Sequence, residues 1–250
     1  MWQHRSAGRP RIFAHRGAMG YAPENTFAAF ELALKQGADV IEFDVHLSAD
    51  QQAVVIHDET LERTTNGHGI VGETTLADLK KLDAGSWRGA EFAGQKIPTL
   101  DEVLAWARGR CNLDIEIKAD PEPYEGLERI VVDLIHQHTM QDEVLVISFD
   151  HRVVQRVKSL APDLATGILY NCRPVDPLAL ARMAGADAIM PTCDFCDEET
   201  IARAHEAGLS VNSWATSDTS VMAKLIARGV DSICSNHPDR VVGVIRRQEG

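Results

Sequence analysis

The sequence predicts a (β/α)8 (TIM) barrel. Short apolar runs alternate with amphipathic stretches along most of the 250 residues, and glycine follows several of the amphipathic stretches, as it does at helix ends. Alternating strands and helices indicate βαβ units, and eight such strands in a chain of this length are typical of a closed barrel. The predicted parallel strands cover residues 12–15, 40–45, 113–117, 144–149, 165–169, 188–190, 209–214 and 232–235.

The first strand leads into a predicted helix at residues 26–36. Asn25 stands before this helix as a candidate N-cap, because its side chain can accept a hydrogen bond from an unpaired backbone N–H. Gly37 follows the last turn, where a positive φ costs little.

One short connection breaks the alternation. Val45 and Val54 are separated by only eight residues, whereas a parallel crossover needs about a dozen or more. We therefore expect residues 53–57 to return as an antiparallel arm with a turn near Asp50. This arm would bring His57 back toward the second strand.

A longer excursion follows at residues 59–98, which are rich in glycine, threonine and charge. One helical piece is predicted at residues 76–82. We expect this segment to be a small insertion that follows the second barrel strand and covers the barrel mouth. The prediction is a single domain over residues 1–250.

Charge and hydropathy exclude several classes of function. The formal net charge is −12, which argues against nonspecific binding to nucleic acid or to an anionic membrane surface. No apolar run approaches the ~20 residues that a membrane span needs. Residues 1–11 are polar and basic, unlike a signal peptide. We expect a cytoplasmic protein without a membrane anchor, and the oligomeric state stays open.

The cysteines indicate thiols in a reducing compartment. There are five of them, and an odd number in a long chain does not suggest a secreted disulfide framework. Cys193 and Cys196 form a CxxC pair, but no second CxxC and no adjacent histidine pair complete the usual zinc pattern.

Two predicted strands carry carboxylates where a barrel strand is normally apolar. Glu42 and Asp44 share one face of their strand, and Asp114, Glu116 and Lys118 share one face of the next. Buried carboxylates are costly unless they are paired or bound to a metal. Structural salt bridges are one interpretation. The other is an all-oxygen site in which Glu42, Asp44 and Glu116 bind one hard divalent cation, Mg²⁺ or Ca²⁺.

Two histidines are candidate proton shuttles. His15 and His57 each end an apolar run, beside Arg16 and Asp58 respectively, and functional groups in a barrel gather at the C-terminal ends of strands. Arg16 could hold a phosphate oxygen through its planar guanidinium or form an ion pair with an acidic neighbour. Lys118 supplies another cation for an anionic substrate. The residues alone indicate metal-assisted phosphoryl or acyl chemistry.

The chain resembles the glycerophosphodiester phosphodiesterases over about residues 12–241. A single His-Arg-Gly would be a weak match, but the whole set in this order and spacing is specific. The matching elements are His15-Arg16-Gly17, Pro23-Glu24-Asn25-Thr26, Glu42-x-Asp44, His57-Asp58, Arg63-Thr64-Thr65-Asn66-Gly67, Glu116-Ile117-Lys118, Ser148-Phe149 and Trp214.

The resemblance implies a role for each of eight residues. Glu42, Asp44 and Glu116 would bind a divalent cation. His15 and His57 would serve as acid and base. The residues that would bind substrate are Arg16, Lys118 and Trp214.

This chain departs from the family pattern near its last two strands. Members typically carry a Thr-Asp pair before a proline, where this chain has Ser235-Asn236-His237-Pro238. Ala215 also stands where a threonine is common. These departures concern the substrate contacts near the last two strands and leave the central residues of the pattern unchanged.

The implied reaction is hydrolysis of a small-molecule glycerophosphodiester to sn-glycerol 3-phosphate and an alcohol. One alternative is a related, phospholipase D-like barrel enzyme that acts on lysophospholipids; it needs an apolar entrance, and residues 59–98 show no strong apolar stripe. The other is a non-catalytic phosphodiester-binding protein, which loss of a ligand or histidine would favour. Here the full set is present.

Overall fold

The chain forms a closed barrel of eight parallel strands. The computed structural model describes residue 2 and residues 8–119 and 123–249. The first strand, β1, pairs with both the second and the last, and this pairing closes the sheet. The (β/α)8 prediction is therefore confirmed. The parallel strands are β1 (Arg11–Ala14), β2 (Val40–Leu47), β4 (Asn112–Ile117), β5 (Val144–Ser148), β6 (Ala165–Tyr170), β7 (Ala188–Pro191), β8 (Ser210–Ser213) and β9 (Ser232–Ser235).

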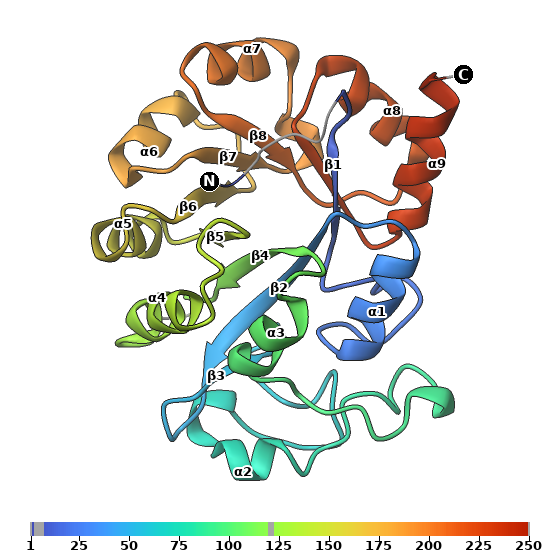
Figure 1. Ribbon diagram of the computed structural model, residues 1–250, viewed down its shortest axis with the longest axis vertical. Coiled ribbons are helices and arrows are strands. Elements are labelled where there is room, and N and C mark those ends of the chain that lie inside the picture. The colour runs from blue at the N-terminus through green and yellow to red at the C-terminus, as the bar shows by residue number, and fades with distance from the viewer. Residues whose placement is uncertain (1, 3–7, 120–122, 250) are drawn as a thin grey trace.

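Helices cover the outside of this sheet (Figure 1). Their buried side chains pack against the outward-facing residues of the strands; the ring of Phe30, for example, lies 5.9 Å from that of Phe43 between centroids. The helices of the outer layer are α1 (Phe27–Lys35), α3 (Leu100–Ala107), α4 (Leu127–Gln137), α5 (His151–Leu160), α6 (Pro177–Ala184), α7 (Glu198–Glu206), α8 (Thr219–Arg228) and α9 (Pro238–Glu249).

The N-cap prediction at α1 is wrong by one residue. Thr26 is the cap, and its side chain accepts a hydrogen bond from the backbone N–H of Ala29. Asn25 instead adopts a left-handed conformation, with φ 57°. Its amide points into the barrel, where Nδ2 donates to Asp44 Oδ2 at 2.9 Å. The Asn25 side chain therefore binds Asp44 in the site and does not cap the helix.

Strand β2 shows how the barrel separates its two faces. Ile41, Phe43 and Val45 belong to the apolar cluster shared with the surrounding helices. Glu42 lies between them on the opposite face and lines a pocket inside the barrel. Because side chains alternate along a strand, the predicted carboxylate face points inward.

The antiparallel arm forms as predicted. Strand β3 (Ala53–Val55) pairs antiparallel with β2, with Val55 opposite Val45. The turn between them includes Gln51, which has φ 62°. The backbone N–H of Ile56 then bonds to the Asp44 carbonyl at 3.1 Å. The arm thus delivers the residue after Ile56 to the rim of the barrel.

The insertion lies beside β3 (Figure 1). Its apolar residues form a small core together with Val54 of that strand. It contains α2 (Leu76–Leu79), shorter than the predicted helical piece, and two 3₁₀ turns, η1 (Val71–Glu73) and η2 (Ala90–Phe92). Hydrogen bonds from Arg63 and Arg88 join it to the loop between β1 and α1. The single-domain assignment and the covering of the mouth stay predictions. Within the described residues, every helix is too short or too polar to span a membrane.

Candidate active site

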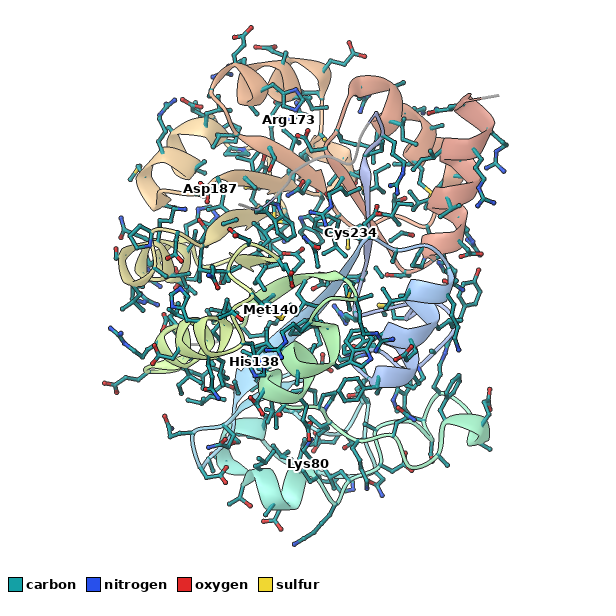
Figure 2. All side chains as sticks on the ribbon, in the orientation of Figure 1. Lys80, His138, Met140, Arg173, Asp187 and Cys234 are labelled. Atoms are coloured by element: carbon teal, nitrogen blue, oxygen red, sulfur yellow. The ribbon has the colours of Figure 1, made fainter. Side chains whose placement is uncertain are left out.

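A pocket at the C-terminal ends of the strands collects the predicted site residues. Cys234, labelled in Figure 2, is one of its lining residues and comes from the last strand. Asp44 is not a lining residue, but it contacts two lining residues, Arg16 and Lys118. The other seven predicted site residues line it: His15, Arg16, Glu42, His57, Glu116, Lys118 and Trp214.

The turn after β1 positions His15 and Arg16. The backbone N–H of His15 bonds to the Ser235 carbonyl at 3.0 Å, which extends the β1–β9 ladder. Arg16 then has φ 51° and Gly17 has φ 77°. A Cβ on Gly17 would lie 2.7 Å from the carbonyl carbon of Ala29, so only glycine fits there. The turn also directs the Arg16 backbone N–H to Glu42 Oε2 at 2.7 Å.

Three carboxylates meet inside the barrel. Asp44 and Glu116 are direct neighbours across β2 and β4. One oxygen from each of Glu42, Asp44 and Glu116 lies within 4.8 Å of the others. Metal–oxygen distances of about 2.1–2.5 Å allow oxygens up to roughly 4–5 Å apart to share one ion. The buried Asp44 Oδ1 accepts no hydrogen bond in the described part of the chain. This group is compatible with a divalent metal site.

The electrostatics of the group also suit a bound cation. Burial, followed by repulsion from Asp44 and Asp114, raises the pKa of Glu42. Burial and Asp44 likewise raise the pKa of Glu116 to about 7. Burial also opposes ionisation of Asp44, but Lys118 and Arg16 outweigh it and lower the pKa of that carboxyl. Simultaneous ionisation of all three carboxyl groups is therefore unfavourable, and a bound cation would relieve the repulsion between them.

The two positively charged side chains predicted to bind the substrate, Arg16 and Lys118, already contact the carboxylates. Lys118 Nζ lies 2.7 Å from Glu116 Oε1 and 3.4 Å from Asp44 Oδ1. Arg16 Nε lies 3.3 Å from Asp44 Oδ2. The ion pair considered for Arg16 is therefore present. These positive charges meet the carboxylates at one point of the pocket.

His15 is oriented by the last strand. Its Nδ1–H donates to Asn236 Oδ1 at 2.7 Å. An amide oxygen can only accept, so this contact keeps the proton on Nδ1 and leaves Nε2 as the basic nitrogen. Burial, and then the positive charge of Arg16, lower the pKa of His15 to about 4. The neutral Asn236 stands where the family resemblance leads one to expect an aspartate.

His57 has a different set of partners. Its Nδ1 lies 2.6 Å from Asp58 Oδ1. Its backbone carbonyl accepts a hydrogen bond from His46 Nε2 at 2.9 Å, and His46 Nδ1 in turn lies 2.9 Å from the Tyr124 hydroxyl. Burial lowers the pKa of His46 to about 4, so this supporting ring is neutral. The carboxylate of Asp58 fixes the ring, and His46 fixes the backbone.

Sequence reasoning assigned no role to several residues that hold the site together. Glu24, only 4% exposed, accepts a hydrogen bond from Arg16 Nη1 at 2.8 Å. Its signal was its place in the Pro-Glu-Asn-Thr element. The signal for His46 was the alternation of polar residues on β2, where it follows Glu42 and Asp44 on the inward face.

The opposite wall of the pocket is apolar. Phe149 and Trp214 pack edge to face, with ring centroids 5.2 Å apart. Trp214 Nε1 donates to the Met190 carbonyl at 2.7 Å, which fixes the indole plane. Ile147 and Leu169 complete this wall. The site therefore combines an ionic half with a rigid aromatic half.

Several known proteins with similar sequences are described as glycerophosphodiester phosphodiesterases. The model of the glycerophosphoryl diester phosphodiesterase family matches residues 15–240. A glycerophosphodiester phosphodiesterase of Caldanaerobacter subterraneus is 38% identical over 94% of this chain and 98% of its own length. A putative glycerophosphodiester phosphodiesterase of Bacillus subtilis, YhdW, is 42% identical over 92% of this chain and 96% of its own.

Solved structures agree. A phosphodiesterase of Oleispira antarctica in complex with the product sn-glycerol-3-phosphate has a TM-score of 0.87 and 34% identity, covering 95% of this chain and 97% of that one. A glycerophosphodiester phosphodiesterase of Agrobacterium tumefaciens has a TM-score of 0.83 and 35% identity, covering 94% and 99%. The chain therefore belongs to the glycerophosphoryl diester phosphodiesterase family.

Proposed function

We propose that this protein hydrolyses glycerophosphodiesters to sn-glycerol 3-phosphate and an alcohol, using one divalent cation, Mg²⁺ or Ca²⁺. The observation that carries the proposal is the convergence of three carboxylates, two histidines and two cationic side chains in one pocket. Family membership and the product complex of the Oleispira antarctica relative support it.

Glu42, Asp44 and Glu116 are the residues that would hold the cation. Their oxygens fit a hard ion, since all three donors are carboxylates. When bound, the cation supplies positive charge against the phosphate oxygens. Asn25 Nδ2 donates to Asp44 Oδ2 at 2.9 Å and so orients the Asp44 carboxylate.

Arg16 and Lys118 would bind the phosphate of the substrate. Both are mostly buried, with side-chain exposures of 13% and 12%. Both approach Asp44, so they flank the proposed cation position. Guanidinium groups suit phosphate oxygens because of their planar donor geometry, and the ammonium group adds a point charge.

We assign the two histidines to opposite ends of the reaction. His15, held by a neutral amide, favours the unprotonated ring and would remove a proton from the attacking group. That group is either water or the glycerol 2-hydroxyl, and in the second case water then opens the cyclic phosphate. His57, whose Nδ1 is held by the carboxylate of Asp58, would donate a proton to the departing alkoxide. Burial lowers the pKa of His57, and the carboxylates of Asp44 and Asp58 oppose that shift. Both use Nε2, because Nδ1 of each is occupied.

Trp214 and Phe149 would contact the carbon atoms of the glycerol group. Their rigid edge-to-face arrangement makes an apolar surface directly across from the ionic half. Such a surface adds contact area without competing for the phosphate.

We propose a small water-soluble substrate, no nucleic acid partner and a cytoplasmic location. The formal net charge of −12 disfavours polyanionic partners. The described residues contain five free cysteines, which suit a reducing compartment.

The deciding assay measures release of the alcohol, choline or ethanolamine, from glycerophosphocholine, glycerophosphoethanolamine and lysophosphatidylcholine. It also measures sn-glycerol 3-phosphate as the second product of the two diesters. We expect turnover of the two diesters with Mg²⁺ or Ca²⁺ and loss of turnover in excess chelator. Faster turnover of the lysolipid would favour the phospholipase D-like alternative. Binding without turnover of any substrate would favour a non-catalytic protein.

A further inference from the structure

We infer that Arg63, on the insertion, is a positioning residue that holds His57 and Arg16 in fixed relation to one another. It does so by bridging the two carboxylates that orient them, Asp58 and Glu24. This inference deepens the proposed hydrolysis and rests on it.

The contact with Glu24 is a two-pronged ion pair. Arg63 Nη1 donates to Glu24 Oε2 at 2.7 Å, and Nη2 donates to Oε1 at 2.8 Å. The same Oε1 accepts from Arg16 Nη1 at 2.8 Å. The buried carboxylate therefore lies between two guanidinium groups, and its position depends on both.

The contact with Asp58 is also two-pronged. Arg63 Nε donates to Asp58 Oδ2 at 2.6 Å, and Nη2 donates to Oδ1 at 2.8 Å. Asp58 Oδ1 is the atom that holds the ring of His57. One planar guanidinium thus connects the partner of His57 to the partner of Arg16.

The backbone of the insertion fixes where Arg63 stands. Its neighbours Thr64 and Thr65 are buried, and Thr65 Oγ1 donates to the Leu61 carbonyl at 2.6 Å. Leu61 belongs to the apolar core of the insertion. Arg63 itself does not line the pocket among the described residues. It would therefore act only through Asp58 and Glu24, which is the definition of a positioning role.

Lysine cannot replace this group. Arg63 places four donor contacts on two carboxylates from one rigid plane. An ammonium group keeps the charge but lacks that planar fork. Loss of the bridge would leave Arg16 with Glu24 and His57 with Asp58, but would free the two pairs to move apart.

The test compares Arg63→Gln and Arg63→Lys with Arg88→Gln. Arg88 is the matched control, since it also lies on the insertion and bonds to the same loop, but to the Gly20 carbonyl rather than to a site carboxylate. With glycerophosphocholine, both Arg63 variants should lose about 10–100-fold in kcat, the range for residues that orient catalytic or metal-binding groups without contacting the substrate. KM should rise by a smaller factor than kcat falls, because Arg16, which would bind the phosphate, keeps its contact with Glu24. The Arg88 variant should keep wild-type kcat.

A double-mutant cycle separates positioning from general loosening. If Arg63 acts through His57, the effect of Arg63→Gln should shrink when His57 is already alanine. An effect that adds in full to His57→Ala would overturn the inference, as would kcat values of both Arg63 variants within about twofold of wild type. Wild-type protein without diesterase activity would instead refute the proposed function. Thermal unfolding of each variant identifies any that fails to fold, and Arg63→Lys then decides.

Discussion

The two halves of the pocket differ in the kind of side chain that lines them: one is ionic and the other is apolar. Strands β1, β2 and β4, with the β3 arm, supply all the ionisable groups of the proposed reaction, from His15 to Lys118. Strands β5 to β8 supply Ile147, Phe149, Leu169, Met190 and Trp214. The side chains of the ionic half are joined by many hydrogen bonds, whereas the apolar half is held by packing and by the hydrogen bond from Trp214 to the Met190 carbonyl. Chemistry and shape are thus assigned to separate parts of one barrel.

The largest effect should come from the ionic half. His57→Ala removes the proposed acid, and such a group contributes about 10²–10⁴-fold in rate. We expect kcat on glycerophosphocholine to fall by that factor while binding of sn-glycerol 3-phosphate changes little. Steady-state kinetics and calorimetric titration measure the two quantities. Activity close to wild type would remove His57 from the mechanism.

Glu116→Gln should have the next largest effect. It keeps the shape of the side chain but removes one charge from the proposed cation site. We expect weaker cation affinity and at least ~10-fold lower turnover, the scale of weakening a metal site. Turnover measured against Mg²⁺ and Ca²⁺ concentration tests this. Full activity of the variant in excess chelator would refute the metal mechanism.

Asn236→Asp should change the pH profile. The pKa of His15 lies at about 4, and a carboxylate beside Nδ1 would raise it by about 1–3 units. A base must be unprotonated to act, so activity is lost below its pKa. The acid limb of kcat/KM should therefore move to higher pH in the variant. A profile of kcat/KM between pH 4 and 9 checks this (about the range in which histidine titrates), and an unmoved limb would assign the base elsewhere.

The apolar half should respond more weakly and in a different parameter. Phe149→Leu removes the edge-to-face contact with Trp214, which is worth about 0.5–1.5 kcal/mol. We expect KM to rise roughly 2–10-fold with kcat nearly unchanged. The loosened Trp214 would lose contact with the glycerol group, and that contact would be made equally in the ground and transition states. A large drop in kcat would erase the distinction between the two halves.

The smallest expected effect is on stability without metal. Glu116→Gln relieves repulsion among the carboxylates, so the chelated variant should melt at the same temperature as wild type or slightly above it. A gain of about 1 kcal/mol corresponds to roughly 2–4 °C in a chain of this size. Calorimetry in chelator measures it. A clearly lower melting temperature would mean that Glu116 stabilises the metal-free barrel.

The fold and the site differ in how far the sequence predicted them. The barrel, the antiparallel arm and the inward face of β2 follow from local patterns: periodicity, glycine stops and one short connection. The convergence of the carboxylates follows from the register of neighbouring strands. These are short-range rules, and they predicted the elements in the right order.

The supporting contacts could not be predicted in this way. Arg63 meets Glu24 across 39 positions, and His15 meets Asn236 across 221. No periodicity links such pairs. Asn25 shows the same limit on a small scale, since its residue type suited a helix cap but its side chain holds Asp44. Long-range polar partners depend on the closed three-dimensional structure.

The pairing of β1 with β9 also sets when the protein can become active during its synthesis. His15 leaves the ribosome long before its backbone and side-chain partners, Ser235 and Asn236, which lie more than 200 residues later in the chain. A nascent chain therefore already contains the ionic groups of the site but still lacks β9, the strand that closes the barrel around them. Contacts of such long sequence separation form late and slowly. We expect catalytic competence to appear in one step once β9 has paired with β1, so that chains terminated before β9 stay inert.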